Sequence, residues 1–419
     1  MRRLSASLIL TNDRPPLENG IVTTAADGTI LKVESGNGTA GPDTEFYNGI
    51  IIPGFVNCHC HLELSHLKGM IPAGKGLGSF LTELSAAERA EREMAEKAAR
   101  RTTGETAEKT TGEAAGQANP EAIVAAAEAA DRDMYREGTE LCADICNNSS
   151  TFGIKSKSRI SYFNLIEVFS PDPALAPGRI QHAANLAAES TKAGLPFSIV
   201  PHSVYSVSLP LFRLIKEKSS GNRVSSIHFM ESEGEEMFLS DRSGPLMEAF
   251  SWAGLIPAVL HTPENSVSAI LDEVTPSGSL ILVHNIHAGR ETVRKINPRG
   301  NVYWCLCPVS NLRIEGRMPP LAMLMEEGCD IVIGTDSLAS NESLGILPEL
   351  KTIQQHHPSV RLEDLIRWST INGARALGQE NKYGSISPGK RPGLLLVENA
   401  DTANMKLTPD TTVSRLIKN

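Results

Sequence analysis

The sequence predicts an α/β protein built as a (β/α)8 barrel, with a small β domain formed from both chain ends. From Ile51 onward, eight short apolar runs alternate with helical patterns, and eight parallel strands are the number that closes a barrel. The residues before and after that region carry short strand and turn patterns instead. The length of 419 residues exceeds one ordinary domain and suits one large barrel with an attachment.

The two chain ends share the pattern of a small β domain. Their candidate strands and turns are Leu8–Leu10, Gly20–Thr23, Thr29–Val33, Gly384–Lys390 and Gly393–Val397. Ala26-Asp-Gly-Thr29 supplies the turn of a hairpin between two of these strands. We therefore expect residues 1–50 and 381–419 to form one composite domain, and residues 51–380 to form the barrel.

The barrel elements follow in order along the chain. The apolar, β-branched runs predict strands at 51–58, 139–145, 159–168, 196–201, 224–229, 279–284, 301–306 and 330–335. Helical periodicity between them predicts helices that include 178–193, 208–219, 264–275 and 318–328. The alternation of strand and helix favours a parallel sheet.

Residues 86–130 interrupt this alternation just after the first strand. They contain two Ala/Glu-rich helical patterns joined by a Thr/Gly/Glu-rich connection at 101–119. The insertion could cover the strand ends as a lid, or it could be a solvated excursion without a catalytic part. We assign no catalytic residue to it.

Composition excludes several classes of protein. The net charge of −9 and pI near 5.7 argue against a nucleic-acid or anionic-membrane surface. No stretch approaches 18 apolar residues, and the N-terminal apolar run is too short for a signal peptide. The seven cysteines form no repeating framework, so reduced thiols in a cytoplasmic protein fit best.

The first apolar run ends in the pattern His59-Cys-His61. Residues two apart on a strand face the same side, so the two imidazoles should point together while Cys58 and Cys60 point away. Two imidazoles on one face form half of a divalent-metal site. An exposed strand face with two histidines would give the same pattern, so the rest of the chain decides.

Polar residues follow the ends of four further predicted strands. They are His202, His228 with Glu231, His284, and Asp336. A barrel site uses the C-terminal ends of several strands, so these side chains should meet His59 and His61. The imidazoles of His59, His61 and His228 with the carboxylate of Asp336 suit one Zn²⁺ or Fe²⁺, with one position left for water.

A metal in such a site lowers the pKa of its water from about 15.7 toward 7 and so yields a hydroxide nucleophile. Asp336 could accept the proton of that water. Glu231, three residues beyond His228, is placed to shuttle a proton to the substrate, and His284 could hold the nucleophile or polarise the group under attack. The predicted catalytic residues are therefore Glu231, His284 and Asp336.

These motifs resemble the amidohydrolase superfamily, in the branch with cytosine, guanine and S-adenosylhomocysteine deaminases and the triazine hydrolases. The matching segments are Pro53–His61, His228–Glu231, His284, Cys307–Asn311 and Gly334–Asn341. The resemblance implies a (β/α)8 barrel flanked by a β-sandwich from both termini, and the metal and catalytic residues given above. It also implies substrate contacts from His202, Ser337 and Asn341. His61–His66 and Ala143–Asn147 resemble more narrowly the aminodeoxyfutalosine deaminases.

The chain departs from the family pattern in two places. Binuclear members carry a lysine at the end of strand four, whereas residues 195–208 contain none, which favours one metal. Lys390-Arg-Pro-Gly393 replaces a common family motif, but that change concerns the small domain. Relatives are commonly homodimers, although no interface can be identified in the sequence.

Other metal chemistries fit the sequence less well. In a zinc-finger site the thiols of Cys58 and Cys60 would join the imidazoles, but strand alternation separates them, so packing roles are favoured. The zinc nucleobase deaminases of another fold need Pro-Cys-x-x-Cys, and zincin proteases need His-Glu-x-x-His. The sequence contains neither motif.

The expected function is hydrolytic deamination of a small amino-substituted heterocycle, purine-nucleoside-like, with release of ammonia. The first alternative is hydrolysis of another leaving group, such as chloride, an alkylamine or a ring amide. The second alternative is a non-catalytic metal-binding barrel.

Overall fold

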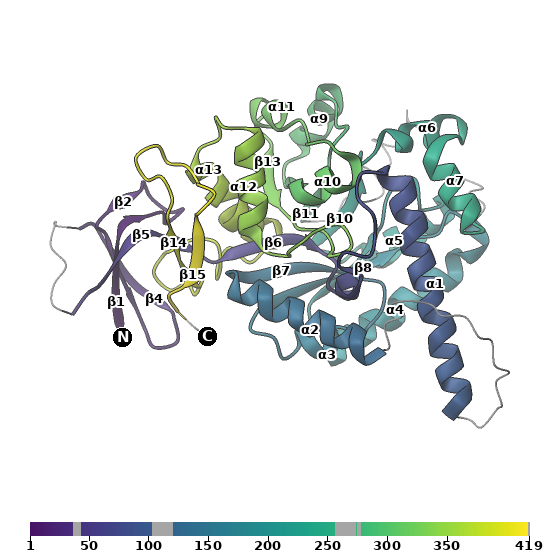
Figure 1. Cartoon of the computed structure of the whole chain (residues 1–419), viewed down its shortest axis with the longest axis horizontal. Coiled ribbons are helices and arrows are strands. Elements are labelled where there is room, and N and C mark those ends of the chain that lie inside the picture. The colour runs from purple at the N-terminus through teal and green to yellow at the C-terminus, as the bar shows by residue number, and fades with distance from the viewer. Residues whose placement is uncertain (37–42, 103–119, 256–273, 275–277, 418–419) are drawn as a thin grey trace.

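The computed structural model describes residues 1–36, 43–102, 120–255, 274 and 278–417 (Figure 1). Its strands fall into one mixed sheet at one end of the molecule and two parallel sheets in the body. The predicted α/β class with parallel strands is confirmed at this level.

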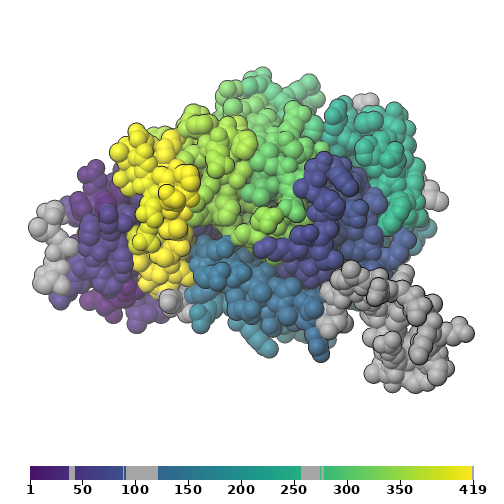
Figure 2. Space-filling view, viewed as in Figure 1, coloured from purple at the N-terminus to yellow at the C-terminus, as the bar shows by residue number. Residues whose placement is uncertain are grey.

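Both chain ends build the mixed sheet. Its strands are β1 (Arg2–Ile9), β2 (Leu17–Glu18), β3 (Ile21–Thr24), β4 (Ile30–Glu34), β5 (Glu45–Pro53), β14 (Leu394–Glu398) and β15 (Thr412–Arg415). Their order is β15-β14-β5-β1-β3-β4, with β2 beside β1. The predicted hairpin is confirmed, because β3 and β4 pair antiparallel. The purple N-terminal and yellow C-terminal segments therefore lie side by side in Figure 2.

The apolar run at 51–58 belongs to two sheets, which the sequence did not indicate. Strand β5 ends at Pro53 in the mixed sheet, and β6 (Phe55–Cys60) begins the first parallel sheet. Gly54 forms the corner between them. A Cβ there would lie 2.2 Å from Glu140 Cγ and 2.7 Å from Pro392 O, so only glycine fits.

The eight predicted body strands are all present. They form two four-stranded parallel sheets, β6-β7-β8-β9 and β10-β11-β12-β13. The strands after β6 are β7 (Thr139–Cys146), β8 (Ser161–Val168), β9 (Phe197–Pro201), β10 (Val224–Phe229), β11 (Ser279–His284), β12 (Val302–Leu306) and β13 (Asp330–Ile333). Single parallel bridges, Ser203 to His228 and Cys60 to Asp336, link the sheets at both pairs of edges.

Helices fill the connections between the strands. The described α-helices are α1 (Gly76–Thr102), α2 (Pro120–Arg136), α3 (Phe152–Lys155), α4 (Ala176–Lys192), α5 (Leu209–Ser219), α6 (Glu233–Asp241), α7 (Gly244–Trp252), α9 (Arg290–Ile296), α10 (Pro308–Glu315), α11 (Leu321–Glu326), α12 (Ile346–His356), α13 (Leu362–Arg367) and α14 (Gly373–Ala376). A 3-10 helix, η1 (Leu62–Leu67), follows β6 directly.

Most of the predicted helices are confirmed, with shifted ends. The two helical patterns of the insertion form α1 and α2, whereas their connection at 103–119 lies outside the described residues. The helix predicted at 318–328 begins only at Leu321, after Pro319 and Pro320. The helix predicted at 264–275 falls almost wholly outside the described residues.

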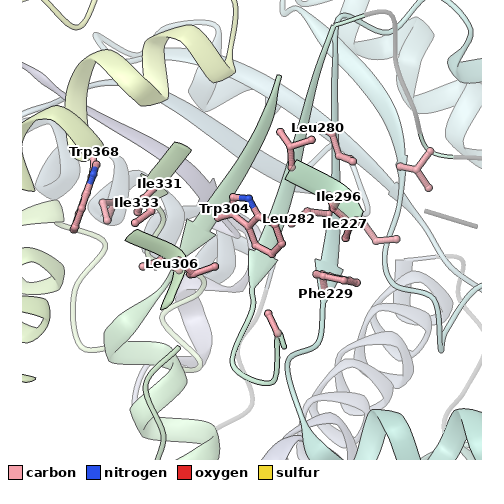
Figure 3. Close-up of a cluster of buried hydrophobic side chains, with 14 of the residues drawn as sticks. Ile227, Phe229, Leu280, Leu282, Ile296, Trp304, Leu306, Ile331, Ile333 and Trp368 are labelled. Atoms are coloured by element: carbon pink, nitrogen blue, oxygen red, sulfur yellow. The ribbon is translucent and has the colours of Figure 1, made fainter. Parts of the chain in front are cut away.

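Both faces of the parallel sheets are apolar and buried. All eight strands contribute to one buried cluster, through Val56, Leu141, Leu165, Val200, Val224, Ile281, Tyr303 and Val332. Neighbouring positions such as Leu280 and Leu282 face the other way, toward the helices, with Trp304 (Figure 3). Burial on two faces explains why these strands appear in the sequence as continuous apolar runs.

Within the part of the chain that the structure describes, no helix combines the length and apolar character needed to cross a bilayer.

Candidate active site

The polar residues predicted at the strand ends lie together at one edge of the two parallel sheets. The ring centroid of His59 lies 4.9 Å from that of His61, 4.8 Å from that of His228 and 5.7 Å from that of His284. Asp336 follows β13 and is bridged to β6. Residues separated by 277 positions in the chain, 59 to 336, thus share one buried centre.

The inner atoms of this centre are close enough to share an ion. His59 Nε2 and His61 Nε2 lie 3.1 Å apart. The Oδ1 atom of Asp336 lies 3.6 Å from the first of these nitrogens and 3.4 Å from the second. Two sets of ligand atoms each fall within 4.8 Å, His59 with His61 and Asp336, and His59 with His228 and His284.

Outer hydrogen bonds fix the orientation of two imidazoles. His228 Nδ1 lies 3.0 Å from the carbonyl oxygen of His202, which can only accept, so this nitrogen carries the proton and donates. His284 Nδ1 likewise lies 2.8 Å from Asn311 Oδ1. In both rings, Nε2 is then left with its lone pair toward the centre. This is the arrangement that metal-binding histidines need.

Burial keeps the imidazoles neutral. It lowers the pKa of His59 and His228, and it lowers the pKa of His61 to about 3. Burial alone would raise the pKa of Asp336, but the neighbouring imidazoles of His59 and His61 hold it well below its usual range. Neutral imidazoles with an ionised carboxylate are the protonation states of a divalent-metal site.

Glu231 lies beside this cluster, and its pKa is shifted in the opposite direction to that of Asp336. One carboxylate oxygen, Oε1, is 3.6 Å from His284 Nε2, and the residue is only 4% exposed. Burial, with the nearby charge of Asp336, raises the pKa of Glu231 well above its ordinary value. The raised pKa favours the protonated carboxyl group, which is the form that can donate a proton.

Three residues of the site have left-handed backbone conformations. Their φ angles are 47° at Met230, 73° at His284 and 59° at Asp336. Non-glycine residues avoid this region unless the surroundings hold them there, and such residues concentrate at functional sites. The strand ends turn sharply at these positions.

A third set of ligand atoms, Glu167 with His202 and His228, also lies within 4.8 Å. A second ion there would need His228 Nδ1, which already donates to a carbonyl group. The rings of His202 and His228 also stack, with centroids 4.4 Å apart. The geometry is thus consistent with one ion, as the missing lysine predicted.

The residues predicted to bind substrate have different surroundings. His202 stacks on His228, and its Nδ1 lies 2.8 Å from Ser206 Oγ, so it borders the centre. Burial lowers the pKa of His202 to about 3. Ser337 is buried directly after Asp336, with its Oγ 3.3 Å from Ser340 Oγ.

Asn341 is committed to its own loop. Its Nδ2 donates to Thr335 O at 2.9 Å and to Glu349 Oε1 at 2.7 Å. Its Oδ1 accepts from the backbone N–H groups of Glu342 and Ser343. These four bonds use the full capacity of an amide, so Asn341 holds its own loop together, and its substrate contact stays a prediction.

Cys58 and Cys60 lie in two different buried clusters, although the sequence predicts that they share one face of the strand. The pairing of β6 with β7 shifts register between Asn57 and Cys60, a β-bulge that breaks simple alternation. Cys60 packs away from the histidines against α2 residues such as Ala127, as predicted. Cys58 instead joins the cluster to which all eight strands contribute, with Cys305. Both cysteines are buried packing residues, which confirms their predicted role.

Sequence reasoning assigned no role to several residues that support this centre. Asn311 accepts from His284, and Ser310 and Ser340 donate to Asp336. Ser310 and Asn311 belong to the segment Cys307–Asn311, which was singled out only as a motif. Glu167 lies near the end of β8, and its Oε1 atom is 3.5 Å from His228 Nδ1. No sequence pattern indicated this residue.

Comparison with known proteins now identifies the family. Residues 50–419 match the Amidohydrolase family. The chain belongs to the amidohydrolase family. This confirms the resemblance inferred from the motifs.

Named relatives of this amidohydrolase include deaminases. It is 25% identical over 365 residues to an adenosine deaminase of Helicobacter pylori. That match covers 83% of this chain and 79% of the relative. It is 28% identical over 210 residues to a 5-methylthioadenosine/S-adenosylhomocysteine deaminase of Pyrococcus abyssi. That match covers 48% of this chain and 44% of the relative, so it spans less than half of either protein.

The fold of this amidohydrolase also matches a solved structure. The crystal structure of Helicobacter pylori aminofutalosine deaminase in complex with methylthio-coformycin superposes with a TM-score of 0.76 at 20% identity. The match covers 95% of this chain and 92% of that one. At this identity the likeness shows a shared fold.

Proposed function

We propose that this amidohydrolase removes an amino group by hydrolysis from an adenosine-like heterocycle and releases ammonia. The observation that carries the proposal is the pairing of two opposite environments. Neutral imidazoles and an ionised carboxylate surround one point, and a buried, protonated Glu231 lies next to them. Hydrolytic deamination needs a nucleophilic water and a proton donor on the same side of a ring.

The residues present fit a divalent metal. The ligand atoms of His59, His61 and Asp336 are all buried and lie within 4.8 Å of one another, and those of His59, His228 and His284 do so as well. Imidazole nitrogens with a carboxylate oxygen at this spacing are a donor set that suits Zn²⁺. His59, His61, His228 and Asp336 would hold Zn²⁺, with Fe²⁺ as the alternative, and the metal would supply Lewis acidity that makes water nucleophilic at neutral pH.

The chain's own groups divide the remaining work. Asp336 accepts a proton from the attacking water as the new C–O bond forms at the amine-bearing ring carbon. Glu231 donates its proton to the adjacent ring nitrogen as the C=N bond opens. The proton held by Asp336 passes to the amino group, the C–N bond breaks and ammonia leaves, while the hydroxyl proton on the same carbon returns to Glu231 as the C=O bond forms. His284 holds the oxygen in place, and Asn311 holds His284.

The names of the relatives support this substrate class. An adenosine deaminase and a methylthioadenosine/S-adenosylhomocysteine deaminase are both similar to this chain. His202 and Ser337 are the proposed contacts to the heterocycle.

We further infer that the two parallel sheets close into one (β/α)8 barrel, flanked by a β-sandwich domain of residues 1–50 and 381–419. Bridges link both pairs of sheet edges, and all eight strands share one buried cluster, which supports closure. The seven cysteines are all free thiols, which supports a reducing compartment such as the cytoplasm.

The test is a substrate panel scored by product, with metal-free and Zn²⁺-reloaded protein. We expect the reloaded protein to release ammonia from adenosine or a 5′-substituted adenosine, and the chelated protein to lose this activity. Release of chloride, an alkylamine or a ring-opened amide, without ammonia, would favour the other leaving groups. Stoichiometric Zn²⁺ without any turnover would instead indicate a metal-binding protein.

A further inference from the structure

The carboxylate of Asp336 has two unlike oxygens. Oδ1 faces the inner nitrogens of His59 and His61, at 3.6 Å and 3.4 Å. Oδ2 points the other way and accepts two hydroxyl hydrogen bonds, from Ser310 Oγ at 2.7 Å and from Ser340 Oγ at 2.6 Å. The two serines and the aspartate are all buried.

The two hydroxyl groups come from separate parts of the fold. Ser310 lies in the first turn of α10, after β12, and Ser340 lies in the loop after β13. Ser340 Oγ is also 3.2 Å from Ser337 O, but its contact with the carboxylate is shorter. Two donors fill the two in-plane lone pairs of Oδ2. The carboxylate cannot rotate without breaking both bonds.

We propose that Ser310 and Ser340 are positioning residues that present Asp336 to the metal through Oδ1 alone. The inference depends on the proposed metal set, and it adds a role that no motif assigned. Because Oδ2 is held by the serines, Asp336 acts as a one-oxygen ligand, and the position that a second carboxylate oxygen would take stays open for the reacting water.

The experiment compares wild type with Ser310→Ala, Ser340→Ala and the double variant. The matched control is Ser369→Ala, because Ser369 is equally buried and donates to Leu365 O at 2.8 Å, away from the centre. Zn²⁺ affinity is measured by competition with a chromophoric chelator. The visible spectrum of the Co²⁺-loaded protein reports coordination number, and kcat and KM are measured separately on the best substrate.

Loss of outer hydrogen bonds to a ligand typically costs about 10–100-fold in metal affinity or activity. We expect the double variant to lose Zn²⁺ affinity to this extent and to change the Co²⁺ spectrum. We also expect kcat to fall by about 10–100-fold, while KM stays within about twofold. Each single variant should show part of these effects, and the control should show none.

Wild-type affinity, spectrum and kcat in the double variant would overturn the positioning role. An equal loss in Ser369→Ala would also overturn it, because the effect would then be general loss of packing. If wild type binds Zn²⁺ but releases no ammonia, the proposed function fails, whereas affinity and spectrum still test the serines. Absence of Zn²⁺ binding in wild type would overturn both.

Discussion

Single residues in this site differ in protonation because their surroundings differ. Burial disfavours the charged form of histidine and of glutamate alike, so it lowers the pKa of His61 to about 3 and raises the pKa of Glu231. Asp336 stays ionised because the imidazoles of His59 and His61 adjoin it. One low-dielectric pocket thus supplies both an acceptor and a donor of protons.

The first prediction concerns that donor. Glu231→Gln keeps the size of the side chain but removes the acidic proton, so we expect kcat for ammonia release to fall by about 10²–10⁴-fold. Zn²⁺ content should stay stoichiometric, because Glu231 is not a ligand in the proposed set. Steady-state kinetics and metal analysis of the same sample measure both quantities.

Glu236→Gln is the matched control, since Glu236 lies on the exposed face of α6 only five positions away. It should keep wild-type kinetics. Turnover by Glu231→Gln at the wild-type rate would refute the role of Glu231 as proton shuttle.

At the scale of elements, short polar connections hold the ends of the strands in place. Glu235 in α6 accepts from the backbone N–H of Glu231 at 3.1 Å and so fixes the turn between β10 and α6. Asp144 at the end of β7 accepts from the N–H of Leu62 at 2.8 Å and so fixes the start of η1, directly after His61. Both carboxyl groups are buried, and each gives a prediction.

The second prediction is a pH dependence of stability. Burial raises the pKa of Glu235 from 4.5 to about 8 in the folded protein. Between these values the folded protein binds a proton that the unfolded chain has lost, so this group makes the free energy of unfolding fall as pH rises from 4.5 through 8. Each pKa unit corresponds to about 1.4 kcal/mol, so the contribution of Glu235 to this fall in the free energy of unfolding is at most about 5 kcal/mol.

Glu235→Gln keeps an oxygen that can accept from Glu231 and cannot ionise. We therefore expect its free energy of unfolding, relative to wild type, to increase between pH 5 and pH 8 in urea titrations and to level off above pH 8. A constant difference across this range would show that Glu235 is ionised in the folded protein.

The third prediction concerns the buried cation next to Asp144. The Nζ of Lys155 pairs with Asp144 Oδ2, and both side chains have 0% exposure. It also contacts Asn164 Oδ1 at 3.0 Å. Lys155→Met leaves the carboxylate buried without this cation, so we expect a loss of about 3–5 kcal/mol in the free energy of unfolding.

The control for Lys155 is an exposed ion pair. Lys295 pairs with Glu291 on the surface of α9, and both side chains are more than half exposed. Water already screens such a pair, so Lys295→Met should not change stability measurably. Equal midpoints for the Lys155 and Lys295 variants in urea would contradict a structural role for the buried pair.

At the scale of the whole molecule, the sequence predicted the features that depend on a local residue pattern, namely the strands and the polar residues at their ends. The eight apolar runs were recognisable because both faces of these strands are buried, and polar residues directly after them marked the strand ends. His59, His61, His228, His284 and Asp336 could be grouped for that reason. The mixed sheet was predictable as two sets of short strands.

The features that the sequence did not reveal depend on contacts between residues that are far apart along the chain. Ser310 meets Asp336 across 26 positions, and nothing in either sequence neighbourhood marks that contact. The register shift between Asn57 and Cys60 accompanies the placement of Cys58 and Cys60 in different buried clusters, which simple alternation does not predict. The sheet boundary at Gly54 follows from its contact with Glu140 and Pro392, which lie far along the chain.

The fourth prediction concerns the attachment of the mixed sheet to the body. The side chain of Arg415 in β15 is almost completely buried at this junction and forms an ion pair with Glu140. Its guanidinium donates hydrogen bonds to Tyr135 O and, at 2.7 Å, to Thr139 O. It also lies over the Tyr135 ring, 3.7 Å from the ring centroid. Arg415→Met removes the charge-assisted bonds. We expect a loss of about 3–5 kcal/mol in the free energy of unfolding. Exposed Arg294→Met is the control and should have no measurable effect.

Tryptophan fluorescence shows whether the mixed sheet and the body unfold together. The three tryptophans lie at 252, 304 and 368, all between the two chain-end segments of the mixed sheet. If the mixed sheet and the body unfold as one unit, Arg415→Met shifts the fluorescence midpoint in urea together with the circular-dichroism midpoint. If the mixed sheet were an independent unit, the fluorescence midpoint would stay at the wild-type value. Because Arg415 bonds β7 and the end of α2 directly, we expect both midpoints to move.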